Sequence, residues 1–176
     1  SWNLMPSYAI HLAVAEEYLK KSNCSKENHE KFIKGVIYPD MVKDKSLSHY
    51  GSNSSVSDLS KFLSRNRVND SFKRGCFLHL MTDYLFYNKY IDTWSKSIYN
   101  DYDILNNELI EKYKLDIPEN AKVSILPTEN KKLTILSENL VDKFISDVSD
   151  FDIDKVAKEI EENPEKWTTF RPLKIV

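Results

Sequence analysis

The sequence is poor in residues that break helices or cross-link chains. Three glycines and six prolines in 176 residues argue against an all-β or low-complexity chain. The two cysteines, Cys24 and Cys76, do not form the dense pattern of a disulfide framework. No apolar run approaches the roughly 18 residues that a membrane-spanning helix needs. These absences leave a helical chain without a transmembrane segment as the default expectation.

An excess of charge of one sign is also absent. The chain has 25 basic and 27 acidic residues, a net charge of −2, and no long block of either sign. It therefore lacks the electrostatic footprint expected of a protein that binds duplex nucleic acid or an anionic membrane. No secretory signal is visible, and the chain begins with Ser1, so Met5 is one candidate native start. We expect a cytoplasmic location.

The residues that are present favour one helical domain spanning 1–176. A hydrophobic content of 41%, with 12% aromatic residues, is enough for a chain of this length to bury a core. Apolar residues recur at helical spacing in segments at about 7–21, 26–34, 70–97, 102–114, 138–148 and 153–162, and after Ser57. Residues 118–136 contain two short β-like runs and fit a hairpin, a loop or a lid equally. We predict an all-α multi-helix bundle.

Local signals set the expected helix boundaries. The expected N-caps are Ser7, Ser25, Ser57 and Asp70. Gly35 is expected to end the second helix, as glycine commonly does at a helix C-terminus. Pro39 favours an extended Tyr38 and a helix boundary near Asp40. Residues 44–55 are the most polar part of the chain and are expected to form a functional or disordered loop.

The segment from Gly75 to Tyr84 carries the strongest functional signal. His79 and Asp83 are four residues apart among apolar neighbours, so both side chains leave the same face of a largely buried helix. A buried carboxylate requires a cation or several hydrogen bonds. A metal ion would satisfy Asp83, but Asp83 could also simply orient a core histidine. Gly75 would let another backbone approach, and Cys76 is expected to be a small core residue rather than a ligand.

Other candidate ligands precede this segment, and each has an ordinary alternative. His11 lies in the first helix, where it could be a core histidine. Asp40 follows a bend and could be a turn residue or an N-cap. His49 lies in the polar loop, where histidines are often exposed but where ligands are also placed. His29 lies in a charged stretch and is expected to be solvated.

The order of these groups resembles a known family. The motifs are Met5-Pro6-Ser7-x-x-x-His11, Gly35-x-x-x-Pro39-Asp40, Ser48-His49 and Gly75-x-x-x-His79-Leu80-x-Thr82-Asp83. They resemble the zinc-dependent phospholipase C superfamily, which includes the fungal single-strand-specific nucleases. The motifs span about half of the chain, from Met5 to Tyr90. The resemblance implies an all-helical fold with a metal cluster between helices.

The resemblance also implies a set of metal ligands. Asp40, His49, His79 and Asp83 would hold one zinc ion, and His11 and Asp83 would contribute to a second. Imidazole nitrogens and carboxylate oxygens suit zinc, and four such ligands fill a tetrahedral site. Two ions about 3.5–4 Å apart can hold a hydroxide for attack on phosphorus, which gives Asp40 and Asp83 a catalytic role. We expect one or two zinc ions and no third, because no histidine follows His79.

These features predict a metal-dependent hydrolase of phosphoric esters, acting on a small phosphoester or a phospholipid head group. Lys43, Lys45 and Arg74 are the candidate contacts to substrate phosphate. The alternative is a non-catalytic, metal-stabilised ligand-binding helical protein with a partly degraded site. Secreted members of the family use a first-residue tryptophan as a ligand, whereas Trp2 here follows Ser1. The chain contains no His-Asp dipeptide, which disfavours a phosphohydrolase of the type marked by that pair.

Overall fold

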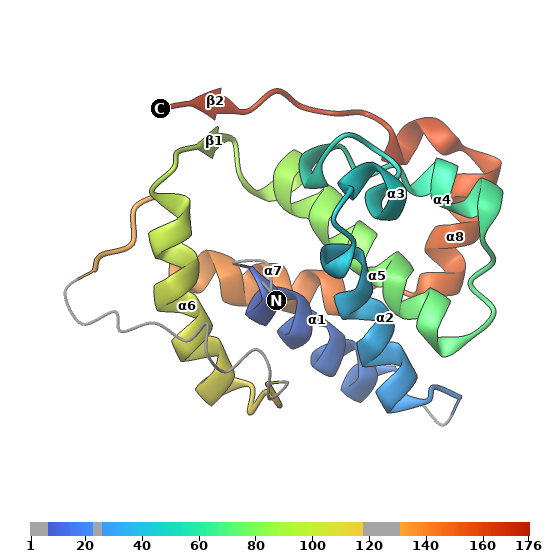
Figure 1. The fold of residues 1–176 in the computed structure, drawn as a ribbon, viewed down its shortest axis with the longest axis horizontal. Coiled ribbons are helices and arrows are strands. Elements are labelled where there is room, and N and C mark those ends of the chain that lie inside the picture. Colours follow the sequence, from blue (N-terminus) through green and yellow to red (C-terminus); the bar gives the residue numbers. More distant parts are fainter. Residues whose placement is uncertain (1–6, 23–25, 118–130) are drawn as a thin grey trace.

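The computed structural model describes residues 7–22, 26–117 and 131–176, which fold into a mostly helical single domain (Figure 1). Its eight α-helices are α1 (Tyr8–Lys21), α2 (His29–Met41), α3 (Lys45–His49), α4 (Leu59–Arg65), α5 (Ser71–Leu85), α6 (Ile98–Lys112), α7 (Glu138–Ser149) and α8 (Ile153–Glu162). Shorter turns are the 3-10 helices η1 (Ser54–Val56) and η4 (Pro164–Trp167), and the π-helical η2 (Phe86–Tyr90). The predicted all-α fold is confirmed. No helix among the described residues has the length and apolarity that crossing a bilayer demands.

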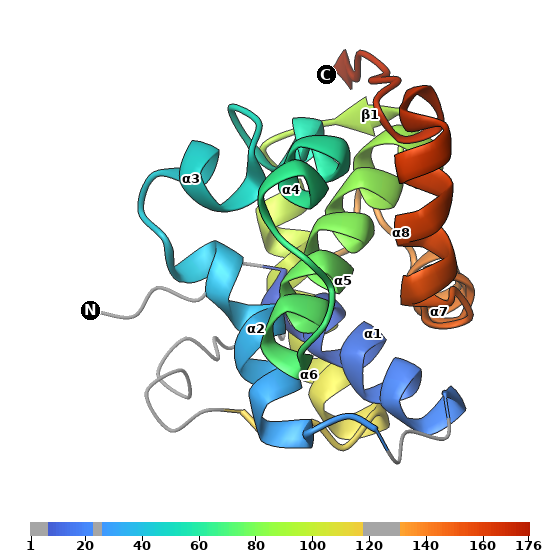
Figure 2. The same ribbon diagram turned by 90° about the vertical axis from the view of Figure 1, so that its right-hand side faces the viewer.

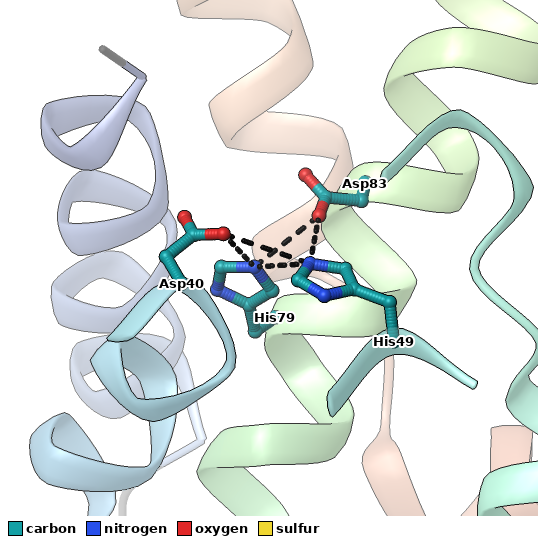
Figure 3. A group of neighbouring side chains, drawn as sticks. All are labelled: Asp40, His49, His79 and Asp83. Atoms are coloured by element: carbon teal, nitrogen blue, oxygen red, sulfur yellow. Dashed lines mark hydrogen bonds and ion pairs between the residues drawn. The ribbon is translucent and has the colours of Figure 1, made fainter. Parts of the chain in front are cut away.

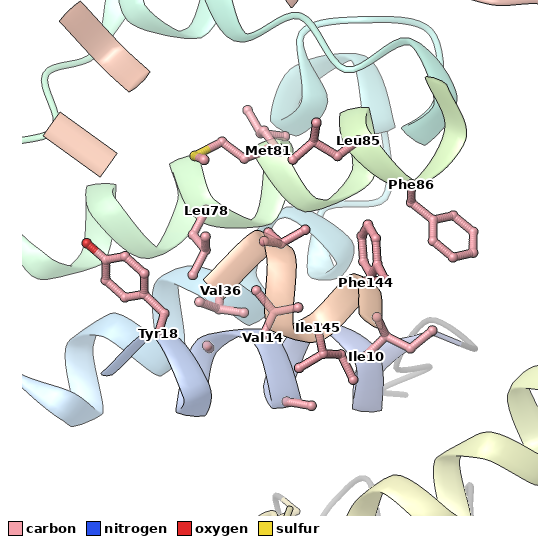
Figure 4. Packing of buried hydrophobic residues seen from close by; sticks show 14 of the residues in the cluster. Ile10, Val14, Tyr18, Val36, Leu78, Met81, Leu85, Phe86, Phe144 and Ile145 are labelled. Atoms are coloured by element: carbon pink, nitrogen blue, oxygen red, sulfur yellow. The ribbon is translucent and has the colours of Figure 1, made fainter. Parts of the chain in front are cut away.

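Helix α5 lies at the centre of the molecule. Figure 2 shows α2 and α3 on one side of it and α7 and α8 on the other. All its residues from Arg74 to Leu85 are buried, as predicted for the segment that carries His79 and Asp83. The core contains side chains from α1, α2, α5, η2 and α7, including those labelled in Figure 4. Burial of this apolar surface is the main stabilising term for such a domain.

The structure corrects the expected boundaries of the second helix. Gly35 does not end the helix, because α2 continues through it to Met41. Tyr38 is helical rather than extended, although the helix still ends close to Asp40. Pro39 lies inside the last turn of α2, where its missing N–H leaves the carbonyl oxygen of Gly35, four residues earlier, without its usual helical donor. Gly35 is needed for packing instead, since a Cβ there would lie 2.0 Å from the carbonyl oxygen of Phe72.

The predicted helix caps are partly correct. The Asp70 side chain caps α5 as expected, by accepting a hydrogen bond from the third amide that follows it. Asp58, not Ser57, caps α4. Ser7 precedes α1 but makes no capping hydrogen bond with its side chain. Ser25 and Cys24 lie outside the described residues.

The polar stretch 44–55 is more ordered than predicted. It contains α3, which Asp44 caps by accepting from the Ser46 amide, and most of η1. The helix predicted to reach residue 97 ends instead with α5 and η2, and α6 begins at Ile98.

The last part of the chain pairs with a segment from the middle of the sequence. Helices α7 and α8 match the predicted segments closely. Two residues near the C-terminal end, β2 (Lys174–Ile175), pair in parallel with β1 (Thr93–Trp94), which the sequence did not predict. Residues 118–130 of the predicted β-like region lie outside the described residues, and 131–136 form neither helix nor strand. The fully buried Asp101 carboxylate accepts hydrogen bonds from the backbone amides of residues 134–136.

Candidate metal centre

Four side chains from three helices meet at one point beside α5 (Figure 3). Asp40 comes from the end of α2, His49 is the last residue of α3, and His79 and Asp83 lie one turn apart on α5. One ligand atom from each lies within 4.8 Å of the ligand atoms of the other three. These four residues form a buried group that could hold a metal ion.

The distances between the ligand atoms fit a small tetrahedral ion. The two histidine Nε2 atoms are 3.3 Å apart, and Asp83 Oδ2 is 3.1 Å from His49 Nε2 and 3.2 Å from His79 Nε2. Asp40 Oδ1 is 3.4 Å from His79 Nε2 and 3.6 Å from His49 Nε2. Zinc bonds of about 2.0–2.1 Å in a tetrahedron place ligand atoms roughly 3.3 Å apart. The donor types therefore suit zinc, and the five distances that involve a histidine nitrogen are close to this spacing.

Hydrogen bonds on the far side of each imidazole aim its Nε2 at the centre. His79 Nδ1 donates to the carbonyl oxygen of Val36 at 2.7 Å. The Ser48 hydroxyl donates to the carbonyl oxygen of Pro39 at 2.7 Å, so its own oxygen accepts from His49 Nδ1 at 2.9 Å. Protein ligands of metals are commonly oriented by such outer contacts. Both histidines are thus held in the form that leaves Nε2 free to bind a cation.

The electrostatics of the group also favour a bound positive charge. His49 is fully buried, His79 is 1% exposed, and both carboxylates have little contact with solvent. Burial alone would lower the pKa of His79, but Asp40 and Asp83 outweigh it and raise the pKa to about 10. Burial would raise the pKa of Asp40, but the neighbouring His79 outweighs it and lowers the pKa to about 2. A proton on His79 can supply the required charge, and a metal ion would replace it.

His11 on α1 lies next to this group and contacts two of its four residues, Asp83 and His79. Its Nε2 is 2.9 Å from Asp83 Oδ1, and its ring stacks on His79 with centroids 3.8 Å apart. Burial, followed by the effect of His79, lowers the pKa of His11 and keeps its imidazole neutral. The Nε2–H group of His11 then donates a hydrogen bond to Asp83 Oδ1. The buried Nδ1 atom has no hydrogen-bond partner among the described residues.

The candidate substrate contacts lie in three different environments. Lys45 Nζ is 3.2 Å from Asp40 Oδ1, at the edge of the group. Lys43 is exposed. The Arg74 guanidinium is buried in ion pairs with Glu27 at 3.0 Å and Asp154 at 2.6 Å, and its contact with substrate stays a prediction. Its side chain is used to join α5 to α8 and to the segment before α2.

The remaining sequence expectations for site residues agree with the structure. His29 is exposed, with its side chain 63% accessible, and pairs with Glu16 rather than with the metal group. Cys76 is a buried free thiol whose pKa burial raises to about 12, which makes it a poor metal ligand. His49 turns inward, as predicted for a loop histidine that completes the site.

Three contributors to the site were missed by sequence reasoning, in whole or in part. The hydroxyl of Ser48 was part of a motif, but its role in orienting His49 was not recognised. The carbonyl of Val36 could not be found, because every residue has a carbonyl and only the fold brings this one to His79. Tyr87 and Tyr102 line a cavity of about 10 Å³ with His11 and Asp83; Tyr87 follows Asp83 by four residues, whereas the proximity of Tyr102 to the site has no local sequence signal. A cavity of that size holds about one water molecule.

Two imidazoles and two carboxylates can therefore bind one cation together. A third imidazole, that of His11, contacts the other carboxylate oxygen of Asp83, Oδ1. Such a group can bind a divalent metal, and its donors are those that zinc prefers. The geometry by itself does not establish a reaction. Comparison of the chain with protein-family models, curated proteins and solved structures finds no match.

Proposed function

We propose that this protein binds zinc through Asp40, His49, His79 and Asp83 and hydrolyses phosphoric esters. The observation that carries the proposal is that the two oxygens of the Asp83 carboxylate face different histidines. Oδ2 faces His49 and His79, whereas Oδ1 lies 2.9 Å from His11. A carboxylate shared in this way supports a centre with room for a second ion, as the motif resemblance to the zinc-dependent phospholipase C superfamily implies.

Zinc at this position would act as a Lewis acid and lower the pKa of a water molecule from about 15.7 towards 7. The residues of the chain contribute binding, charge and orientation. Asp40 and Asp83 provide the negative charge that retains a divalent cation in a buried place. His11 holds the outer oxygen of Asp83 in position. Lys45, beside Asp40, supplies a cation for the phosphate of a small phosphoester or a phospholipid head group.

The test compares the wild type with Asp83→Asn and His11→Ala on a panel of phosphomonoesters and phosphodiesters, with zinc, manganese or magnesium added. Asp83→Asn should abolish hydrolysis, because it removes the shared charge while keeping side-chain size. The stability of the fold should decrease less than the activity does, because a neutral amide is easier to bury than an unpaired carboxylate. His11→Ala should lose activity but retain the ion held by the other four residues. Asp103→Asn, at a carboxylate that pairs with Lys131 and is not one of the proposed ligands, is the matched control and should remain active.

A second function, a metal-stabilised protein without efficient chemistry, is favoured by one observation. The four main ligands are enough to close a tetrahedral site, and the two histidines are almost inaccessible to solvent. Closed four-ligand sites are typical of structural zinc, whereas catalytic zinc keeps a position for water. Elemental analysis separates the two proposals. About two zinc ions with turnover support the hydrolase, about one ion without turnover supports the structural role, and no metal refutes both.

A further inference from the structure

Helices α2 and α5 run side by side in a fixed register. Both begin at the same end of the pair in Figure 1. Contacts recur once per turn between residues 43 apart in sequence. The pairs are Asn28 with Ser71, Phe32 with Gly75, Val36 with His79, and Asp40 with Asp83. The last two pairs belong to the metal centre, so the register of the two helices sets the geometry of the site.

The closest approach of the two helices is at Gly35 and Gly75. A Cβ on Gly35 would lie 2.0 Å from the carbonyl oxygen of Phe72, and one on Gly75 would lie 2.2 Å from that of Phe32. Each glycine thus faces the carbonyl located three residues before the other glycine. Real Cβ atoms essentially never come within 3.0 Å of another heavy atom in this way. Because both obstacles are backbone atoms, a side chain could be accepted only if the helices moved apart.

This contact is directly coupled to the orientation of a metal ligand. The Val36 carbonyl, one residue after Gly35, accepts the 2.7 Å hydrogen bond from His79 Nδ1. His79 itself follows Gly75 by one turn. Separation of the helices by roughly 1 Å would relieve the glycine clash but break a hydrogen bond of this length. It would also draw Asp40 on α2 away from His79 on α5, which lies 3.4 Å from it.

We infer that Gly35 and Gly75 are positioning residues for the metal centre, because their backbone contact holds the Val36 carbonyl against His79 Nδ1. The hydrogen bond fixes the imidazole with its proton on Nδ1 and its lone pair on Nε2, facing the other ligands. This inference rests on the metal-binding part of the proposed function and is independent of hydrolysis. It assigns the two glycines a role that neither ligand chemistry nor helix formation requires.

The test is zinc affinity of Gly35→Ala and Gly75→Ala, measured by competition with a chromophoric chelator. Alanine favours helix more than glycine does, so neither change weakens its own helix. Loss of an outer contact to a metal ligand typically costs 10–100-fold in affinity, and we expect that loss for both variants. The control is Ile160→Ala on α8, which removes a buried side chain from a helix that carries no ligand. It should lose folding stability but keep zinc affinity within about threefold.

The results distinguish this inference from the proposed function. A wild type that binds no zinc refutes the function, whereas glycine variants that bind zinc as tightly as Ile160→Ala refute only the inference. If both variants fail to fold, nitrogen-15 NMR of the zinc-loaded wild type decides. A slowly exchanging proton on His79 Nδ1 is the required result. An unprotonated Nδ1, or one whose proton exchanges as freely as that of exposed His29, overturns the inference.

Discussion

At the scale of single residues, the orientation of the His49 imidazole depends on the neighbouring Ser48 and on a backbone carbonyl from another helix. Ser48 joins it to Pro39 of α2 through a chain of two hydrogen bonds. A histidine in a polar stretch is thereby fully buried beside two carboxylates. The otherwise solvated segment 44–55 is consequently part of the metal centre.

The first prediction concerns this histidine. His49→Ala should weaken zinc binding by roughly 100-fold or more, because it removes a direct ligand and outer contacts alone are worth 10–100-fold. His29→Ala should bind zinc like the wild type, since His29 is exposed and pairs with Glu16. Isothermal titration calorimetry of both variants measures the difference. Equal affinities would remove His49 from the ligand set.

The second prediction concerns pH and the metal-free protein. His79 has an ordinary pKa of 6.5, and its carboxylate neighbours, acting against burial, raise it to about 10 in the folded state. The folded chain thus holds this proton more tightly than the unfolded chain. The resulting stabilisation is complete below pH 6.5 and is lost as the pH rises towards 10.

Urea unfolding with a chelator at pH 6.5, 8 and 9.5 measures this trend. The free energy of unfolding should fall across the series, and the fall should be smaller in His79→Gln, which has no proton to lose. A wild type and a His79→Gln variant with the same pH dependence would show that the proton contributes nothing.

The residues of the centre could largely be predicted, but its geometry could not. His79 and Asp83 follow from an i,i+4 spacing on an apolar helix, which is a local property. The inclusion of His11, Asp40 and His49 required a resemblance in their order, because each is ambiguous by itself. The ion pairs of Arg74 were not foreseen, because its partners, Glu27 and Asp154, are distant in sequence. Charge alone does not reveal which cations are already paired.

At the scale of elements, Asp101 on α6 binds the segment before α7, residues 134–136, through hydrogen bonds. Its carboxylate is completely buried and accepts from three successive backbone amides, those of Thr134, Ile135 and Leu136. Hydrogen bonds to a charged acceptor are stronger than neutral ones. The side chain therefore takes the place of secondary structure for a stretch that has none.

The third prediction is that Asp101→Ala destabilises the fold by about 3 kcal/mol or more, since three backbone amides, one buried and two partly buried, lose their shared charged acceptor. Zinc affinity should change little, because neither α6 nor residues 131–136 carry a ligand. Asp103→Ala, on the same helix and paired with Lys131 at the surface, should cost less than about 1 kcal/mol. Chemical denaturation of both variants measures the contrast. A similar cost for the two would show that the amides find other partners.

Helices with a strong apolar period were predicted well, whereas boundaries set by packing were not. Helices α7 and α8 have apolar faces and clear starts at Ser137 and Asp152, both of which cap them. Gly35 and Pro39 are local signals for a helix end, but contact with α5 overrides them. The pairing of β1 with β2 joins residues about eighty positions apart and leaves no local pattern. Tertiary contacts of this kind decide the details that propensity leaves open.

At the scale of the whole molecule, the metal group joins α2, α3 and α5, three elements of which one is very short. An ion bound there would connect the end of α2 to the central helix and hold α3 against both. The group lies on one side of α5, and the core formed with α7 lies on another (Figures 3 and 4). The expected cytoplasmic location and the substrate class stay predictions.

The fourth prediction is that zinc stabilises the folded protein in proportion to its affinity. Free zinc at 100 times its dissociation constant should add about 2.7 kcal/mol to the free energy of unfolding, if the unfolded chain binds it negligibly. Thermal unfolding with added zinc, and with a chelator in its place, measures the shift. His49→Ala at the same zinc concentration should show a much smaller shift. A wild type indifferent to zinc would contradict both proposed functions.

The position of the ligands along the chain has a consequence for synthesis. All five candidate metal residues lie between His11 and Asp83, whereas α7, which packs on α1, begins only at Glu138. A ribosome delivers the N-terminal part first. A growing chain therefore exposes every group that would hold the ion before the helix that covers the apolar side of α1 exists. During that interval the nascent protein carries its complete ligand set beside a hydrophobic surface that is still open to other chains.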